Sequence, residues 1–227
     1  MTRPRRLTIA AATLVAIAFG AGFADADPII PNASFSLGYS GFTSSYTYLS
    51  SPTLPNDELM YPEGAFTVGA NPSQVHSLWP NFGDHTTGDG SMMIVNGNRA
   101  ADVMVWSATV LVTPDTHYDF SAWAASIYPE SPSGLAFSIN GSLLAAPFVQ
   151  PSTTGLWRQF TSGWYSGTST TATLSLVDWN TEWNGNDFAL DDIALEARPP
   201  VVPEPASLLL FGSGLAALAG VRKNRKE

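Results

Sequence analysis

A short polar segment near the end of the chain carries the residues best suited to binding a sugar. The segment DWNTEWNGND spans residues 178–187 and holds two indoles, one carboxylate and one amide: Trp179, Trp183, Glu182 and Asn184. Indole rings stack on the apolar faces of sugar rings, while carboxylates and amides bind the hydroxyl groups. The composition therefore predicts a carbohydrate-binding loop. The alternative is that one or both rings close the end of the fold.

Three acids next to this segment have the chemistry of calcium ligands. They are Asp187, Asp191 and Asp192, and calcium prefers carboxylate and carbonyl oxygens. The apolar positions of the surrounding strand change from Phe188 and Leu190 to Ile193 and Leu195, which predicts a β-bulge at Asp191–Asp192. Such a bulge turns Asp191 inward, so we expect a structural calcium ion here. The alternative is a bulge whose acids are only solvated or hydrogen-bonded.

A glycine-rich segment, GDHTTGDG at residues 83–90, offers a second group of polar side chains. Asp84, His85 and Asp89 suggest either a metal site or an acid–base pair. Zinc sites use several His or Cys ligands, whereas the chain has three histidines and no cysteine. Three glycines in eight residues favour a turn. No nucleophile elbow, metalloprotease helix or phosphate-binding loop occurs, so we expect no catalysis, although the many acids leave a glycosidase pair open.

These residues belong to a body that is predicted to be all-β. Apolar runs separated by turn residues predict nine to eleven short strands, the clearest at 91–97, 103–112, 118–126, 134–144, 156–165, 171–179 and 188–196. Weaker strands are expected within Asn32–Tyr48, GAFTVG and QVHSLW. Alternation places Trp106 in the core and Trp123 outward, where it is a further candidate for sugar binding. This spacing predicts an antiparallel two-sheet jelly-roll sandwich.

The charge of the body excludes one class of partner. The whole chain has 227 residues and a formal net charge of −9. Between Asp27 and Arg198 there are three arginines, no lysine and 16 acids, so this part carries about −13. Such a surface repels nucleic-acid phosphates and anionic lipids. We therefore expect no nucleic-acid partner.

The first 26 residues have the three parts of a secretory signal peptide. A basic start, MTRPRR, precedes the apolar stretch Leu7–Phe23 and the small-residue site Ala24-Asp25-Ala26. Cleavage there makes Asp27 the mature N-terminus and 27–197 the sandwich domain. The protein is therefore expected to be exported.

The last residues resemble a PEP-CTERM sorting signal at 203–227. A Pro-rich linker at 198–204 leads into Pro203, Glu204 and Pro205, then an apolar helix over Ala206–Val221 and a basic end, Arg222–Lys226. The apolar run is short for a membrane span, and the basic end is expected to stay cytoplasmic. The resemblance implies processing by an exosortase in a Gram-negative bacterium. The tail is then held in the inner membrane only transiently before delivery to the cell surface or extracellular matrix.

The body resembles galactose-binding-like jelly rolls, which include many carbohydrate-binding modules. The resemblance rests on PNASFS, HYDFSAW, LWRQF with TATLSL, and NDFALDDIALE. It implies binding of exopolysaccharide or another glycan, and it implies a structural calcium, although Ser36 stands where related modules have an acid. Two alternatives remain: a purely structural matrix protein without a discrete sugar site, and a polysaccharide hydrolase.

Overall fold

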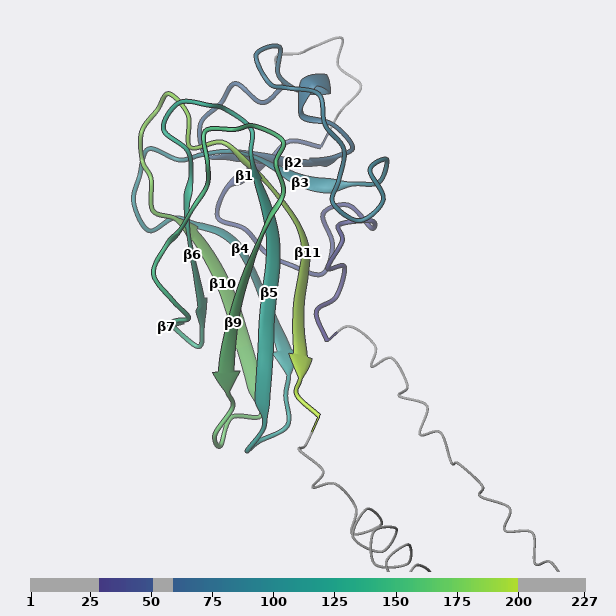
Figure 1. Cartoon of the computed structure of the whole chain (residues 1–227), viewed down its shortest axis with the longest axis vertical. Coiled ribbons are helices and arrows are strands. Elements are labelled where there is room, and N and C mark those ends of the chain that lie inside the picture. Colours follow the sequence, from purple (N-terminus) through teal and green to yellow (C-terminus); the bar gives the residue numbers. More distant parts are fainter. Residues whose placement is uncertain (1–28, 51–58, 200–227) are drawn as a thin grey trace, which may run out of the picture.

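The computed structural model describes residues 29–50 and 59–199, which form a sandwich of two β-sheets (Figure 1). The signal peptide, the Pro-Glu-Pro motif and the apolar tail predicted from sequence lie outside these residues. Within the described part, no helix has the length and hydropathy needed to cross a membrane. The fold is all-β, as predicted, with one short 3-10 helix, η1, at Pro72–Gln74.

One sheet has six strands in the order β1-β2-β3-β11-β5-β9. Their bounds are β1 Thr47–Tyr48, β2 Ala65–Gly69, β3 Met92–Asn96, β11 Phe188–Ala197, β5 His117–Ser126 and β9 Arg158–Tyr165. The other sheet has the order β4-β10-β6-β7, with β8 also paired to β6. Its strands are β4 Met104–Leu111, β10 Thr171–Asp178, β6 Gly134–Ile139, β7 Ser142–Leu143 and β8 Phe148–Val149. All pairs are antiparallel except β1 with β2, which confirms the jelly-roll prediction.

The main core lies between the sheets and follows the predicted alternation. Tyr118 and Phe120 of β5 are buried against Leu174 of β10, and Trp106 of β4 is buried as expected. The predicted bulge is also present, because the register of β11 against β5 shifts between Asp191 and Ala194. These matches follow from period-2 patterning, which is strongest where one face of a strand is buried.

One of the weaker strand predictions is wrong, and another holds only for the short strand β1. The segment QVHSLW forms the end of helix η1 and a turn, because Asn71 caps that helix by accepting a hydrogen bond from Ser73 N at 3.0 Å. Most of Asn32–Tyr48 is turns, and only β1 and a bridge from Thr43 to Ser107 are extended. Here the Asn32 side chain bonds the backbone of the segment that follows it, which competes with strand pairing.

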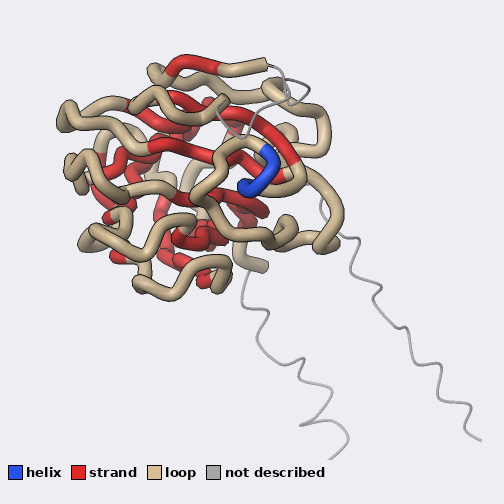
Figure 2. The backbone as a smooth tube through the Cα atoms, turned by 90° about the horizontal axis from the view of Figure 1, so that it is seen from above, coloured by secondary structure: helices blue, strands red, loops and turns tan. Residues whose placement is uncertain are grey.

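The outer face of the six-stranded sheet carries a second apolar core that the sequence did not reveal. Met60, Val75 and Trp79 pack there with Met92 and Ile94 of β3. Figure 2 shows helix η1 and the neighbouring loops on this side of the strands. Strand β3, most of β2 and the start of β11 are therefore buried on both faces, and the covering segment brings Tyr61 through Trp79 close to the start of β11.

Candidate functional site: an aromatic pocket beside three strand ends

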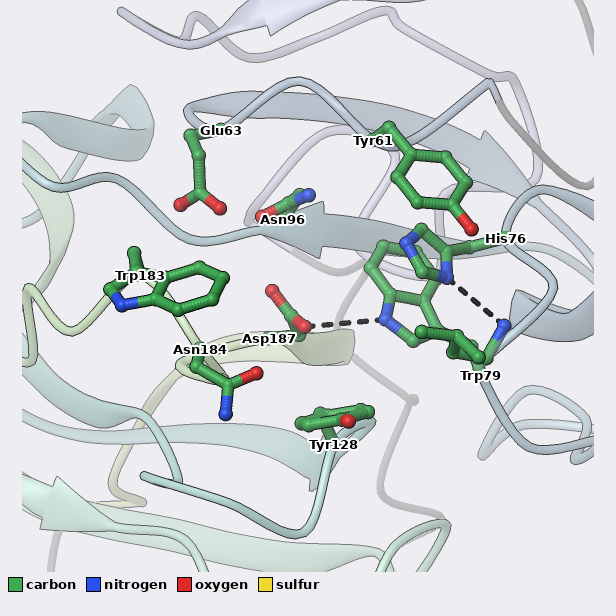
Figure 3. Close-up of a pocket in the computed structure, with 11 residues that line it drawn as sticks. Tyr61, Glu63, His76, Trp79, Asn96, Tyr128, Trp183, Asn184 and Asp187 are labelled. Carbon is green, nitrogen blue, oxygen red and sulfur yellow. Dashed lines mark hydrogen bonds between the residues drawn. The ribbon is translucent and has the colours of Figure 1, made fainter.

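A cavity of about 320 Å³ lies where the covering segment meets the loop between β10 and β11 (Figure 3). Three strand ends reach it: Asn96 ends β3, Tyr128 follows β5, and Asp187 precedes β11. We call this cavity the aromatic pocket. Its lining is Tyr61, Glu63, His76, Leu78, Trp79, Asn96, Tyr128, Trp183, Asn184, Gly185 and Asp187. Its volume is at the small end of the range for ligand sites.

One wall of the aromatic pocket is a stack of three rings. The centroids of Tyr61 and His76 are 4.1 Å apart with an interplanar angle of 26°, and those of His76 and Trp79 are 4.5 Å apart at 17°. The Tyr61 hydroxyl bonds Ser77 Oγ at 2.9 Å. His76 Nδ1 accepts a hydrogen bond from Leu78 N at 3.2 Å, so this nitrogen carries no proton. The stack forms a rigid, mostly apolar surface with a polar edge.

Asp187 places a buried carboxyl group between this wall and the loop. Its side chain accepts hydrogen bonds from Trp79 Nε1 at 3.2 Å and from Gly97 N at 3.3 Å. Burial raises the pKa of Asp187 to about 8, and the negative charges of Glu63 and Asp178 act in the same direction. Loss of solvent also raises the pKa of Glu63, and this is opposed by the charge of Arg99. Asp187 therefore keeps its proton through neutral pH.

The opposite wall is the loop that carries Trp183 and Asn184, which is fixed by its backbone conformation. Gly185 has a φ of +117° and Asn186 a φ of +57°. Asn186 Nδ2 donates to Asn180 O at 2.9 Å, and Asn186 N donates to Ser131 O at 2.8 Å. Asn184 Nδ2 donates to the Glu130 carboxylate. These bonds hold Trp183, which is 63% exposed, at the rim of the pocket.

The structure brings together only part of the predicted carbohydrate-binding set. Trp183 and Asn184 line the aromatic pocket, whereas Trp179 and Glu182 lie outside its lining although they belong to the same loop. Trp179 is 72% exposed and its backbone N donates to Gly134 O. Trp123 is elsewhere, on the outer face of β5. Its ring stacks on a histidine of the loop at 83–90, with a centroid distance of 3.8 Å.

Several lining residues were not predicted as site residues. The rings come from Tyr61, His76, Trp79 and Tyr128, and the polar groups from Glu63 and Asn96. Each of them is more than 50 residues away in sequence from the loop at 183–187, so no local spacing pattern could predict that they share a site. The one local signal is the spacing of His76 and Trp79, which lie three residues apart and stack across a turn.

The three predicted calcium ligands are divided between two places. Asp187 belongs to the aromatic pocket, whereas Asp191 accepts from His85 N at 2.9 Å and from Thr86 N at 3.3 Å. Asp192 Oδ2 lies 2.7 Å from His85 Nδ1. These acids hold the loop at 83–90 and do not fit one ion. The part of the chain that the structure describes has no group of three or more acidic, His or Cys side chains placed to hold a metal. Calcium binding stays a prediction.

The glycine-rich loop itself has the bonding of a turn. Asp84 accepts from Thr87 N at 3.0 Å and from Gly90 N at 2.7 Å. Its carboxylate is therefore used to fold the loop, as the turn interpretation of the sequence predicts. His85 lies between Trp123 and Asp192 and is part of the cover of the six-stranded sheet.

The first comparison concerns the tail, which lies outside the described residues. Residues 201–226 match the model of the PEP-CTERM protein-sorting motif. This chain carries a PEP-CTERM motif. The motif indicates a protein that is exported and sorted by an exosortase in a Gram-negative bacterium. No curated protein matches the sequence.

Solved structures similar to the sandwich include an enzyme and binding modules. A Stig cyclase, Fisc, from Fischerella sp. TAU is 12% identical with a TM-score of 0.52, and the match covers 76% of this chain and 97% of that one. The CBM22-1 xylan-binding domain of Paenibacillus barcinonensis Xyn10C is 14% identical with a TM-score of 0.45, covering 73% and 91%. A family 16 carbohydrate-binding module is 12% identical with a TM-score of 0.44, covering 74% and 98%. Such remote likeness describes fold, so function is argued from the pocket.

Proposed function

We propose that this exported chain is a non-catalytic protein that binds carbohydrate through the aromatic pocket. Its partner is exopolysaccharide or another glycan, which it meets at the cell surface or in the extracellular matrix after exosortase processing. The observation that carries the proposal is the pocket itself. Rings from two walls and polar groups from three strand ends converge on one small cavity in a protein that carries an export-sorting motif.

The chemistry of the pocket suits a sugar unit. The exposed aromatic rings of Tyr61 and Trp183 offer apolar surface for the C–H face of a pyranose. Asn96, Asn184 and the carboxyl groups supply hydrogen-bonding atoms for hydroxyls. A cavity of about 320 Å³ suits one sugar unit better than several, which favours a chain end or a side branch over a long unbranched segment.

Replacing Trp183 with alanine should weaken carbohydrate binding by roughly tenfold or more, because truncating an aromatic ring that stacks on the ligand commonly costs over 1 kcal/mol. Affinity electrophoresis of the full chain against a panel of neutral, amino and acidic polysaccharides measures this change. Trp183 is 63% exposed, so the fold should be preserved.

Trp179→Ala is the matched control, since it removes the same ring from the same loop outside the pocket lining. It should leave affinity unchanged within about twofold, because surface substitutions away from a contact have small effects. Loss of binding in Trp179→Ala with full binding in Trp183→Ala would place the sugar elsewhere on the loop. Absence of binding across the whole panel would contradict the proposed function, and turnover of any polysaccharide would make the chain an enzyme.

A further inference from the structure

The aromatic pocket combines aromatic rings with two acids and no lysine or arginine. The carboxyl groups of Glu63 and Asp187 both face the space that the rings enclose (Figure 3). Two of the three arginines of the described residues are engaged elsewhere: Arg198 pairs with Asp119, and Arg158 lies over the Phe148 ring. The third, Arg99, acts on Glu63 but does not line the pocket.

The other titratable groups around Asp187 add no positive charge that balances the two acids. His76 accepts a hydrogen bond at Nδ1 from Leu78 N, a bond that a doubly protonated ring cannot accept. The phenol groups of Tyr61 and Tyr128 bring no positive charge in either protonation state. Asp178 is a further acid, and its carboxyl group acts to raise the pKa of Asp187. The field inside the pocket is therefore set by carboxyl groups.

We propose that the pocket selects sugars that carry a free amino group, whose ammonium ion lies between Glu63 and Asp187 and among the aromatic rings. This inference rests on the proposed function, because it names the class of sugar bound at the same site. Aromatic rings and carboxylates both attract a desolvated cation. A sugar with a hydroxyl or acetamide at the same carbon makes neither interaction, and a uronic acid finds no lysine or arginine in the pocket lining to pair with.

The ligand should release a proton from the protein when it binds. In the empty pocket, burial keeps Asp187 protonated up to about pH 8. A nearby ammonium favours the charged carboxylate, so Asp187 loses its proton to solvent as the amino sugar enters. Loss of solvent also raises the pKa of Glu63, the other acid lining the pocket, and the same ammonium ion acts to lower it. A neutral sugar leaves both proton equilibria nearly as they were.

The test compares three disaccharides that differ only at carbon 2. They are β-1,4-linked glucosamine, its N-acetylated form, and cellobiose, each titrated calorimetrically into the full chain near pH 5. The neighbouring oxygens make a sugar amine less basic than a lysine, and this lower pH keeps it as an ammonium ion. The amino form should bind roughly tenfold tighter than the other two, since hydrogen bonds to charged groups contribute more than neutral ones. Repeating the titration in two buffers of different ionisation enthalpy should show a proton released only with the amino form.

Glu63→Gln and Asp187→Asn should each remove most of the preference for the amino form, and Asp187→Asn should also remove most of the proton release. Glu63 is exposed, so Glu63→Gln remains informative if Asp187→Asn fails to fold. Glu182→Gln is the matched control, because it removes an exposed acid from the loop between β10 and β11 outside the pocket lining, and it should preserve the preference for the amino form.

Two outcomes would overturn this inference. If all three disaccharides bind equally and Trp183→Ala weakens their binding, the preference for an amino group is wrong and the proposed function is upheld. Binding of none of them would also overturn it, and the polysaccharide panel would then decide the proposed function separately.

Discussion

Gly185→Ala should destabilise the domain by about 3 kcal/mol and abolish binding at the aromatic pocket. Gly185 has a φ of +117°, and a Cβ there would lie 1.8 Å from the Glu130 carbonyl oxygen. Alanine is strained at this φ, and the contact is with backbone, which moves only if the loop moves. For a domain of this size the expected fall in melting temperature is roughly 6–12 °C. Thermal unfolding followed by circular dichroism measures it.

The pocket is lost in the same variant because Gly185 adjoins Asn184 and Trp183, and all three line the cavity. Gly167→Ala is the control. Gly167 also has a positive φ, +52°, but a Cβ there meets nothing within 4 Å, so the expected cost is only about 1 kcal/mol. Equal melting temperatures for the two variants would show that the approach of Gly185 to Glu130 does not constrain the loop.

Asp178→Asn should stabilise the domain at pH 8 by about 2–4 kcal/mol and have little effect near pH 4. Asp178 ends β10 and is 3% exposed. Its Oδ1 accepts from Gly134 N and Asn180 N, both at 3.0 Å, while its Oδ2 makes no hydrogen bond to the described residues. Asparagine keeps the oxygen that is bonded and removes the charge. Burial raises the pKa of Asp178 to about 7, against hydrogen bonds from Asn180 and Gly134 that lower it.

The sign of the pH dependence follows from that shift. The folded state binds the Asp178 proton more tightly than the unfolded state, whose pKa is about 3.9. The stabilisation linked to this proton is therefore complete below about pH 4 and is lost as the pH rises to about 7, at about 1.4 kcal/mol for each pH unit. Asparagine has no such proton, so its advantage should grow over the same range.

Urea unfolding of both proteins at pH 4, 6 and 8 measures the effect. Burial shifts Asp187 and Asp191 in the same direction, with pKa values of about 8 and about 6, so the wild-type domain should itself be more stable at pH 5 than at pH 8. Glu182→Gln, at an exposed acid, should change stability by less than about 0.5 kcal/mol at every pH. The prediction is contradicted if the difference in unfolding free energy between Asp178→Asn and wild type is the same at pH 8 as at pH 4.

Strands with one buried face could be predicted from the alternation of apolar and polar residues. Segments that side-chain hydrogen bonds fold into turns could not be told apart from strands in this way. Period-2 alternation locates β4, β5 and β10, and the change of phase at Asp191–Asp192 locates the bulge. The segment around Asn32 has comparable strand propensity, but side-chain hydrogen bonds fold it into turns. The spacing of apolar residues indicates which face of a strand is buried. It does not indicate where a polar side chain bonds the nearby backbone and so competes with strand pairing.

The candidate site could be predicted only where its chemistry is local. Trp183 and Asn184 stand in one polar loop with other sugar-binding residue types, so composition singled them out. Tyr61 and Trp79 reach the same cavity only because the segment at 59–90 packs on the outer face of the six-stranded sheet. The burial of that face could not be predicted, because the sequence of a strand covered on both faces is a continuous apolar run without alternation.

The second core on the outer face of this sheet has a consequence for the timing of activity. One wall of the pocket belongs to the covering segment and the other to a loop more than 100 residues further on, so neither wall is a binding surface alone. Under the proposed function, the unfolded chain therefore has no affinity for polysaccharide. The capacity to bind appears only when the late loop is seated against the early segment, so it depends on folding of the whole domain.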